Sequence, residues 1–277
     1  MGSKVGSLSL FLVLFSVLLS GFSFPQEASA VVGDYIVADL SGNLHQVTPG
    51  GTITTIASGF GLPLDVAIDA NGDFITIDSV SGSILRITPS GTVTTVTSGL
   101  GLFLSGIAID ATGDYIAVSS GTMYRITPSG TVTTIASGLG GSTIGVTVDS
   151  SGNFIVSSGS NLLQVTPGGT ITTIASGPGQ LNDIAIDATG DYIVTEISGN
   201  LLRITPSGTV TTIASGLGFG ISGVSIDASG NFIVAGANAL QQVTPGGTTS
   251  TIASVGLGNP KGVAVILDPP VSNVGNY

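Results

Sequence analysis

Charged residues interrupt one glycine position of an internal repeat, and they are the first candidates for chemistry in this chain. Asp65 and Asp183 stand where four other copies of the repeat have glycine, and Lys261 directly precedes the last of these glycines. The amide of Asn182 lies beside Asp183. Carboxylates and a lysine can transfer protons, and carboxylate oxygens can hold a hard cation. The catalytic residues of any reaction are otherwise unknown from the sequence.

A second column of the repeat also carries acids. It reads Asp39, Asp78, Ser119, Ser158, Glu196 and Gly236. If the acids of both columns converge on one axis, they could bind Ca²⁺ or Mg²⁺ through oxygen ligands. The alternative is that each carboxylate accepts backbone N–H groups of its own loop. The sequence leaves both alternatives open, so no cofactor is certain and these two cations are the candidates.

A third set of acids has a structural interpretation. Asp before a Gly-closed turn commonly accepts backbone N–H bonds, and this pattern recurs in five copies of the repeat. We therefore assign a turn-forming role to Asp69, Asp110, Asp149, Asp187 and Asp227.

The elements that position these residues are short strands. In one copy, β-branched and alternating segments predict strands over residues 65–69, 73–78, 83–87 and 92–96, joined by tight turns. Gly-Asp or Gly-Asn followed by an aromatic and Ile recurs six times, with a period of 38 to 41 residues. Units of this size must stack to bury their apolar faces. Each unit is expected to be a four-stranded antiparallel meander.

The two ends of the chain predict how the units close. The first unit enters at its second strand, over residues 34–39, whereas the last strand, residues 262–266, is a first strand with nothing after it. Together they complete one blade and remove the open edge. The fold class is therefore all-β, a six-bladed β-propeller over residues 31–268. Asp65 and Asp183, three blades apart, should face each other across the channel.

Arginines and amides predict cross-strand pairs within the blades. Arg86, Arg125 and Arg203 occur with Asp73, Asp114 and Asp191, whereas Gln164 and Gln242 occur with Asn153 and Asn231; blade 1 pairs Asp34 with Gln46. Such pairs are worth a few tenths of a kcal/mol. The arginines are thus expected to be sheet partners rather than ligand clamps.

The repeats resemble known propeller families. Gly106-Ile-Ala-Ile-Asp-Ala-Thr-Gly-Asp-Tyr-Ile looks like the NHL repeat, and Gly190-Asp-Tyr-Ile-Val-Thr-Glu196 with Leu202-Arg-Ile-Thr-Pro-Ser-Gly-Thr-Val210 looks like repeats of streptogramin (virginiamycin B) lyases. A more distant similarity is to propellers of the SMP-30/gluconolactonase type. The resemblance to the lyases implies seven blades and histidines that act with a Glu and a divalent cation.

This chain departs from the lyases where they are most specific. The column that should hold histidine reads Leu64, Ser105, Ile144, Asn182, Ser222 and Lys261. The single histidine, His45, falls on a third strand, where we expect an exposed side chain. We also expect no Ser-His-Asp set, because His45 should be far from any suitable nucleophile.

The ends and the composition limit location and partners. Lys4, an apolar run over residues 8–19 and a small-residue site at residues 28–30 indicate a signal peptide over residues 1–30. The protein is therefore expected to be secreted or periplasmic, with no membrane attachment after cleavage. Residues 269–277 form a tail. A net charge of −11 argues against nucleic acid, and the absence of Cys excludes disulfides and thiolate sites.

Two hypotheses follow for function. The first is a secreted, non-catalytic binding or structural module that contacts cell-envelope protein, polysaccharide or a copy of itself; the near-uniform repeats favour it. The second is a divalent-metal-dependent lyase or lactonase that uses Asp65, Asp183 and Glu196 at one mouth of the channel.

Overall fold

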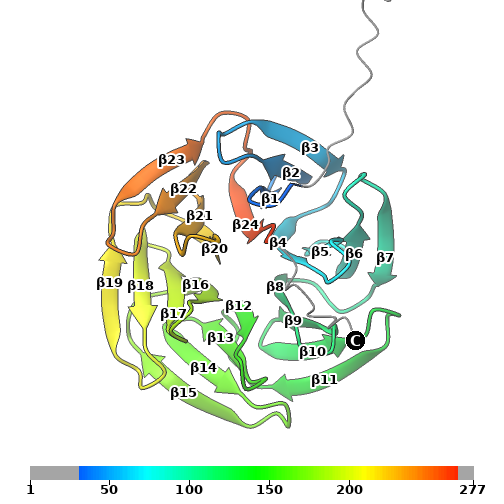
Figure 1. The fold of residues 1–277 in the computed structure, drawn as a ribbon. Coiled ribbons are helices and arrows are strands. Elements are labelled where there is room, and N and C mark those ends of the chain that lie inside the picture. Colours follow the sequence, from blue (N-terminus) through cyan, green and yellow to red (C-terminus); the bar gives the residue numbers. More distant parts are fainter. Residues whose placement is uncertain (1–30, 268–277) are drawn as a thin grey trace, which may run out of the picture.

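The computed structural model describes residues 31–267, which form a ring of six four-stranded antiparallel sheets and contain no helix. Figure 1 looks along the axis of this ring, with one strand of each blade at the centre and one at the rim. The all-β, six-bladed propeller expected from the repeat is confirmed. The predicted signal peptide, residues 1–30, and the predicted tail, residues 269–277, lie outside the described residues.

Each blade contributes one strand to each of four concentric positions, here called first to fourth from the axis outward. The first strands are β24 (Pro260–Val265), β4 (Pro63–Ile68), β8 (Leu104–Ile109), β12 (Thr143–Val148), β16 (Leu181–Ile186) and β20 (Ile221–Ile226). The second strands are β1 (Tyr35–Asp39), β5 (Phe74–Asp78), β9 (Tyr115–Ser119), β13 (Phe154–Ser158), β17 (Tyr192–Glu196) and β21 (Phe232–Gly236).

The outer half of each blade is a hairpin. The third strands are β2 (Asn43–Val47), β6 (Ser83–Ile87), β10 (Thr122–Ile126), β14 (Asn161–Val165), β18 (Asn200–Ile204) and β22 (Ala239–Val243). The fourth strands are β3 (Ile53–Ser58), β7 (Val93–Thr97), β11 (Val132–Ser137), β15 (Ile171–Ser176), β19 (Val210–Ala214) and β23 (Thr249–Ala253). Strand β4 begins at Pro63, two residues earlier than the strand predicted from the sequence over residues 65–69.

Blade 1 closes the ring with both ends of the described chain. Strand β24 pairs antiparallel with β1, with Tyr35 opposite Val265 and Val37 opposite Val263. In Figure 1 the orange-red β24 accordingly lies beside the blue β1. This pairing completes blade 1 as a four-stranded sheet, with β24 at its inner edge and β3 at its outer edge.

The core lies between the blades rather than within one sheet. All five residues of each second strand are buried; in β5 these are Phe74–Asp78. One cluster joins Ile36 and Leu44 of blade 1 to Val66 and Ile87 of blade 2. β-Branched and aromatic residues on both faces of the middle strands are what such two-sided burial requires.

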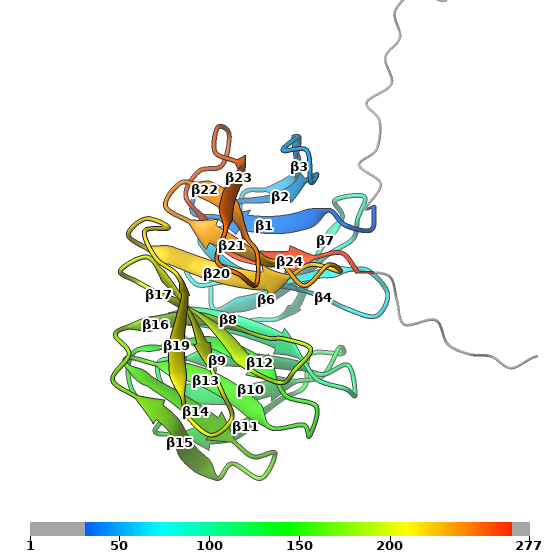
Figure 2. The ribbon, with the colours of Figure 1, turned by 60° about the vertical axis from the view of Figure 1, so that its left-hand side comes forward.

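The ring has two faces, which the view in Figure 2 shows from another angle. We call "linker face" the one that carries the segments joining each fourth strand to the next first strand, together with the turns between second and third strands. The opposite face carries the remaining turns. Within residues 31–267 there is no helix long and apolar enough to cross a membrane.

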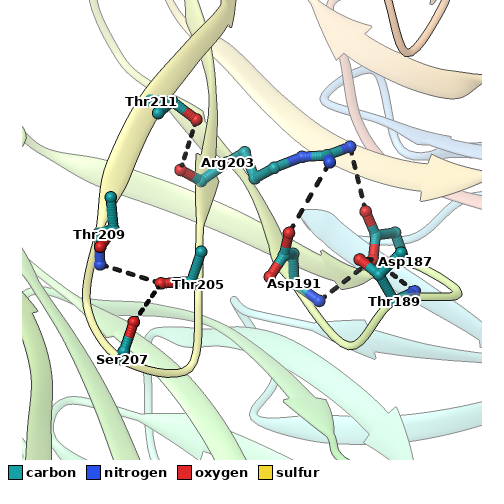
Figure 3. Close-up of polar contacts among 8 residues, drawn as sticks. All are labelled: Asp187, Thr189, Asp191, Arg203, Thr205, Ser207, Thr209 and Thr211. Atoms are coloured by element: carbon teal, nitrogen blue, oxygen red, sulfur yellow. Dashed lines mark hydrogen bonds and ion pairs between the residues drawn. The ribbon is translucent and has the colours of Figure 1, made fainter.

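Charged pairs at the face opposite the linkers differ in part from the expected ones. Arg86 lies 4.0 Å from Asp73 as expected, but Arg125 pairs with the turn residue Asp110, at 3.4 Å, and not with Asp114. Arg203 reaches both Asp187 and Asp191 (Figure 3). The turn acid projects beside the strand start, so a long guanidinium side chain can reach either carboxylate.

The amide pairs also run through the turn acids. Asn231 and Gln242 both donate to Asp227, and Asn153 donates to Asp149 rather than to Gln164. In blade 1, which has no turn acid before its second strand, Gln46 donates directly to Asp34. Each turn acid also accepts the backbone N–H groups of its own turn; the residues are Asp69, Asp110, Asp149, Asp187 and Asp227.

Candidate functional site

The axial channel contains two cavities that meet at Asp65 and Asp183. The larger, of about 390 Å³, is lined by the later residues of the first strands and by Leu267. The smaller, of about 10 Å³, is lined by the second residues of these strands, including Ser105 and Lys261, and therefore lies toward the linker face. Both cavities are lined by Asp65 and Asp183, so the structure brings this pair together in one channel.

Both carboxylates are bound to the backbone of the following blade. One oxygen of Asp65 accepts the N–H of Val66 at 2.8 Å, and the other accepts the N–H of Ile107 in β8 at 2.9 Å. The carboxylate of Asp183 accepts the N–H of Val224 in β20 at 2.9 Å. Each acid thus joins two neighbouring first strands, which is a structural use of its oxygens.

The channel nevertheless raises the pKa of both acids. Burial raises the pKa of Asp65 well above its ordinary value, and the nearby charge of Asp183 raises it further, against the lowering effect of the two backbone N–H bonds. Burial also raises the pKa of Asp183 to about 6. Two carboxylates that line one channel resist simultaneous ionisation.

Close packing explains why other blades have glycine at this position. A Cβ atom on Gly145 would lie 2.6 Å from the Asn182 carbonyl oxygen and 2.8 Å from the Asp183 Cα. A Cβ on Gly223 would lie 2.3 Å from the Lys261 carbonyl oxygen. Real Cβ atoms do not approach backbone atoms this closely, so the wall of the channel is a tight contact of strand against strand.

Lys261 and Asn182 are the second residues of their first strands, one position nearer the linker face than the acid pair. Lys261 is half-buried, its pKa is lowered by desolvation, and it makes no ion pair within residues 31–267. Asn182 is buried and donates its amide to the Ile221 carbonyl at the start of β20. Asn182 therefore links blades 5 and 6. No comparable link between blades is assigned to Lys261 among the described residues.

The acids at the ends of the second strands have a different environment. Asp78 accepts the N–H groups of Gly61 and Leu62 in the preceding linker, and Ser119 and Ser158 donate to the linker carbonyls of Leu102 and Leu139. Asp39 likewise accepts the N–H of Gly258 at 3.0 Å. This column fixes the linkers, and neither Asp39, Asp78 nor Glu196 lines the two channel cavities.

Glu196 is held within its own turn. Its carboxylate accepts bonds from the Ser198 hydroxyl and the Asn200 amide. No group of three or more His, Cys, Asp or Glu side chains in the described part of the chain is placed to hold a metal ion. Ca²⁺ takes six to eight oxygen ligands. The residues present, two carboxylates already committed to backbone N–H groups, do not fit such a site.

His45 corrects two expectations. It is buried, with 4% of its surface exposed, because β2 faces blade 6 at this position. Its Nε2 lies 2.9 Å from an Asp39 oxygen, and its Nδ1 lies 3.1 Å from the Thr55 hydroxyl in β3. A carboxylate, an imidazole and a hydroxyl are therefore connected. The sequence argument missed this set because it placed His45 by strand number alone.

Sequence reasoning also missed a group of exposed apolar side chains on the linker face. Phe103, Phe219 and Val255 belong to three linkers, with 68%, 79% and 89% of their surfaces exposed. Phe103 has φ of 69°, in the left-handed region that bulky residues avoid. Its N–H donates to Ser79, which places it beside the exposed Val80. The available signal was an aromatic residue that follows Gly-Leu-Gly in one linker and Gly-Leu-Gly-Leu in another.

Comparisons with known proteins support the fold alone. No family model matches the sequence, and neither does any curated protein. A chain of a nidogen/laminin complex superposes with a TM-score of 0.76 at 14% identity, covering 84% of this chain and 98% of that one.

Two enzyme-related structures are also similar. Virginiamycin B lyase from Staphylococcus aureus, in an inactive form with quinupristin, gives a TM-score of 0.62 at 17% identity, covering 88% of this chain and 94% of the lyase. A putative gluconolactonase gives 0.65 at 14% identity, covering 75% and 82%. These likenesses agree with the resemblance seen in the repeats, and at such identities they establish the propeller architecture and not an activity.

Proposed function

We propose that this protein is a non-catalytic binding module that engages a partner protein through its linker face. The observation that carries the proposal is Phe103, whose large apolar side chain is 68% exposed on a backbone with φ of 69°. Strained backbone persists where surrounding structure holds it, and it concentrates at functional sites. Neighbouring exposed apolar side chains are typical of interaction surfaces, and Phe103 forms such a group with Leu102 and Val80.

The chemistry of this surface favours protein over polysaccharide or a nucleic acid. Its exposed members are Phe, Leu and Val side chains, which offer no hydrogen bonds to sugar hydroxyls: Val80, Leu102, Phe103, Phe219 and Val255. The net charge of −11 disfavours polyanions. The nidogen/laminin complex is one structure in which a chain of this architecture belongs to a protein assembly.

The test is affinity capture with matched variants. The wild type should capture a partner from the cell-envelope fraction of the producing organism, and Phe103→Ser with Phe219→Ser should lose it. Val93→Ser, at an exposed valine near the opposite face, serves as the control and should retain it. Equal capture by all three proteins, or none by the wild type, would refute the proposal. Sedimentation of the wild type shows whether the partner is a second copy.

Export is part of the proposal. The order of a basic residue, an apolar run and a small-residue site in residues 1–30 supports secretion to the periplasm or beyond. The mature protein should then begin at Val31. Intact-mass measurement of protein from the producing cells checks this, because an uncleaved chain would retain the mass of residues 1–30.

One observation favours a second candidate, lyase or lactonase chemistry in the channel. Asp183, with a pKa of about 6, lines the 390 Å³ cavity together with Asp65, so it could act as a general acid or base near neutral pH. Turnover of lactone substrates that disappears in Asp183→Asn would support it. Elemental analysis before and after chelation shows whether stoichiometric Ca²⁺ or Mg²⁺ accompanies the protein.

A further inference from the structure

The set formed by Asp39, His45 and Thr55 occurs in only one of the six blades. The position of His45 is Leu85, Tyr124, Leu163, Leu202 and Gln241 in the others, whereas the position of Thr55 is threonine in every blade. The hydroxyl is thus common to all fourth strands, and the imidazole that contacts it is particular to blade 1. The other blades provide built-in controls for whatever the imidazole does.

The hydrogen bonds assign the state of the imidazole. Asp39 accepts the N–H groups of Ser41, Asn43 and Gly258, so its oxygens act as acceptors throughout. His45 must therefore donate Nε2–H to Asp39. In a neutral ring this leaves Nδ1 as an acceptor, and the Thr55 hydroxyl donates to it.

This arrangement is the one that activates a hydroxyl nucleophile. The imidazole is in contact with the hydroxyl proton, and a buried carboxylate fixes the tautomer and ring orientation. Asp39 is 1% exposed and His45 is 4% exposed, whereas Thr55 is exposed on the outer strand, where a reagent can reach it. Thr55 lines neither of the two channel cavities.

We propose that Thr55 is an acyl-acceptor site, with His45 as its general base and Asp39 as the residue that positions His45. The co-reactant is an activated acyl ester. The Thr55 oxygen forms a bond to the acyl carbon as the carbon–oxygen bond to the leaving group breaks. The hydroxyl proton passes to His45 Nδ1 and then to solvent, and the leaving group departs with its electron pair. The product is a threonine ester on the rim of blade 1, a modification rather than turnover.

The experiment uses p-nitrophenyl acetate as the acyl donor and mass spectrometry of the digested protein as the readout. Thr173, the exposed residue opposite Leu163 in blade 4, is the internal reference within the same molecule. The Thr55 to Thr173 acetylation ratio should be about 100, the lower end of what general-base catalysis contributes. Equal acetylation of the two threonines, or acetyl on His45 instead of Thr55, would overturn the proposal.

Variants separate chemistry from folding. His45→Leu should reduce the ratio to about 1, in keeping with the lost general-base factor, and it should fold because leucine occupies this position in three other blades. His45→Gln, which copies Gln241 of blade 6, is the second choice if circular dichroism shows a loss of fold. Thr55→Val should remove acetyl from that peptide.

Asp39 is tested as a positioning residue by the same ratio. Asp39→Asn should lower the Thr55 to Thr173 ratio among folded molecules, because the amide no longer fixes the tautomer. A purely structural role would change stability and leave the ratio unchanged, since both threonines belong to one molecule. In the control Leu163→His, an imidazole enters blade 4 beside Ser158, which donates to Leu139 and supplies no carboxylate. Thr173 should then react more slowly than Thr55 of the wild type; reaction at the same rate would remove any role for Asp39.

Discussion

Two acids with almost equal exposed surface behave in opposite ways in this propeller. Asp78, at the linker face, is 9% exposed, and Asp65, in the channel, is 7% exposed. Burial acts to raise the pKa of both. The pKa of Asp78 is nonetheless lowered, whereas that of Asp65 is raised well above its ordinary value. Similar exposed surface therefore does not mean similar desolvation, because Asp65 lies deep in the channel and Asp78 lies near the surface of the linker face.

The groups around each carboxylate add to this difference in desolvation. Hydrogen bonds from Gly61, Leu62, Ser81 and Val80 outweigh the cost of burying Asp78. Asp65 accepts only the N–H groups of Val66 and Ile107, and it faces the carboxylate of Asp183. Donors favour the charged form and a second carboxylate disfavours it. In this protein the linker turns supply N–H donors to Asp78. The strands of the channel wall supply fewer, because most of their N–H groups already pair within the sheets.

The largest effect is expected when the donors at the linker face lose their acceptor. Asp78→Ala leaves the N–H groups of Gly61, Leu62 and Val80 without a protein partner. It should lower the free energy of unfolding by about 3 kcal/mol. This is less than the full value of three hydrogen bonds to a charged group, because water can reach the exposed residues Gly61 and Val80. Urea denaturation measures this. Asp78→Ser, which copies Ser119 and Ser158, should cost less; an equal cost would show that a hydroxyl cannot replace the carboxylate as the acceptor of these donors.

The pH dependence of stability should carry the signature of the channel pair. A raised native pKa gives stability that is fully present below the unfolded value, about 4, and is lost as pH rises through about 6 for Asp183. Unfolding free energy should therefore fall between pH 4.5 and 7.5, by on the order of 2 kcal/mol. The lowered pKa of Asp78 acts in the other direction and only below about pH 4.

Replacing the pair checks the origin of this slope. Asp65→Asn with Asp183→Asn should flatten the unfolding free energy between pH 4.5 and 7.5, because the amides do not titrate there. Denaturation at three pH values is sufficient. A slope that survives in the double variant would assign it to other groups.

A smaller effect is expected from filling the glycine position of the channel. Gly145→Ala places Cβ 2.6 Å from the Asn182 carbonyl oxygen and should cost about 1.5 kcal/mol through overpacking. Gly141 lies in the linker between β11 and β12, where an added Cβ would have nothing within 4 Å. Gly141→Ala is therefore the matched control. Thermal unfolding of the two variants compares them. Equal melting temperatures would mean that the wall can shift, and that packing does not restrict acids to blades 2 and 5.

The smallest effect concerns the half-exposed pair at the opposite face. Hydrogen bonds from Thr189 and Asp191 and the charge of Arg203 outweigh burial and lower the pKa of Asp187. Arg203→Gln should cost about 0.3–0.5 kcal/mol, the usual value of an exposed ion pair. High salt should reduce the difference in stability between the wild type and Arg203→Gln, because it screens the ion pair. A loss above about 1 kcal/mol would show that charge partners outweigh backbone donors here, in contrast to Asp78.

The sequence by itself determined the architecture, because its information is local and repeated. A period of 38 to 41 residues, turn glycines and β-branched runs specify one blade, and six copies with complementary ends specify closure. Counting blades was sufficient to place Asp65 and Asp183 in one channel. The residue pattern also assigned the turn acids, since each accepts N–H groups within five residues of itself.

Only the tertiary structure decided which side chains meet across blades and linkers. The burial of His45 between Asp39 and Thr55, the choice of Asp110 by Arg125 and the linker bonds of Asp78 depend on how neighbouring strands face one another. A one-residue change of register would send these side chains to the other face of the sheet. Such contacts join residues that the repeat keeps apart, so spacing along the chain does not encode them.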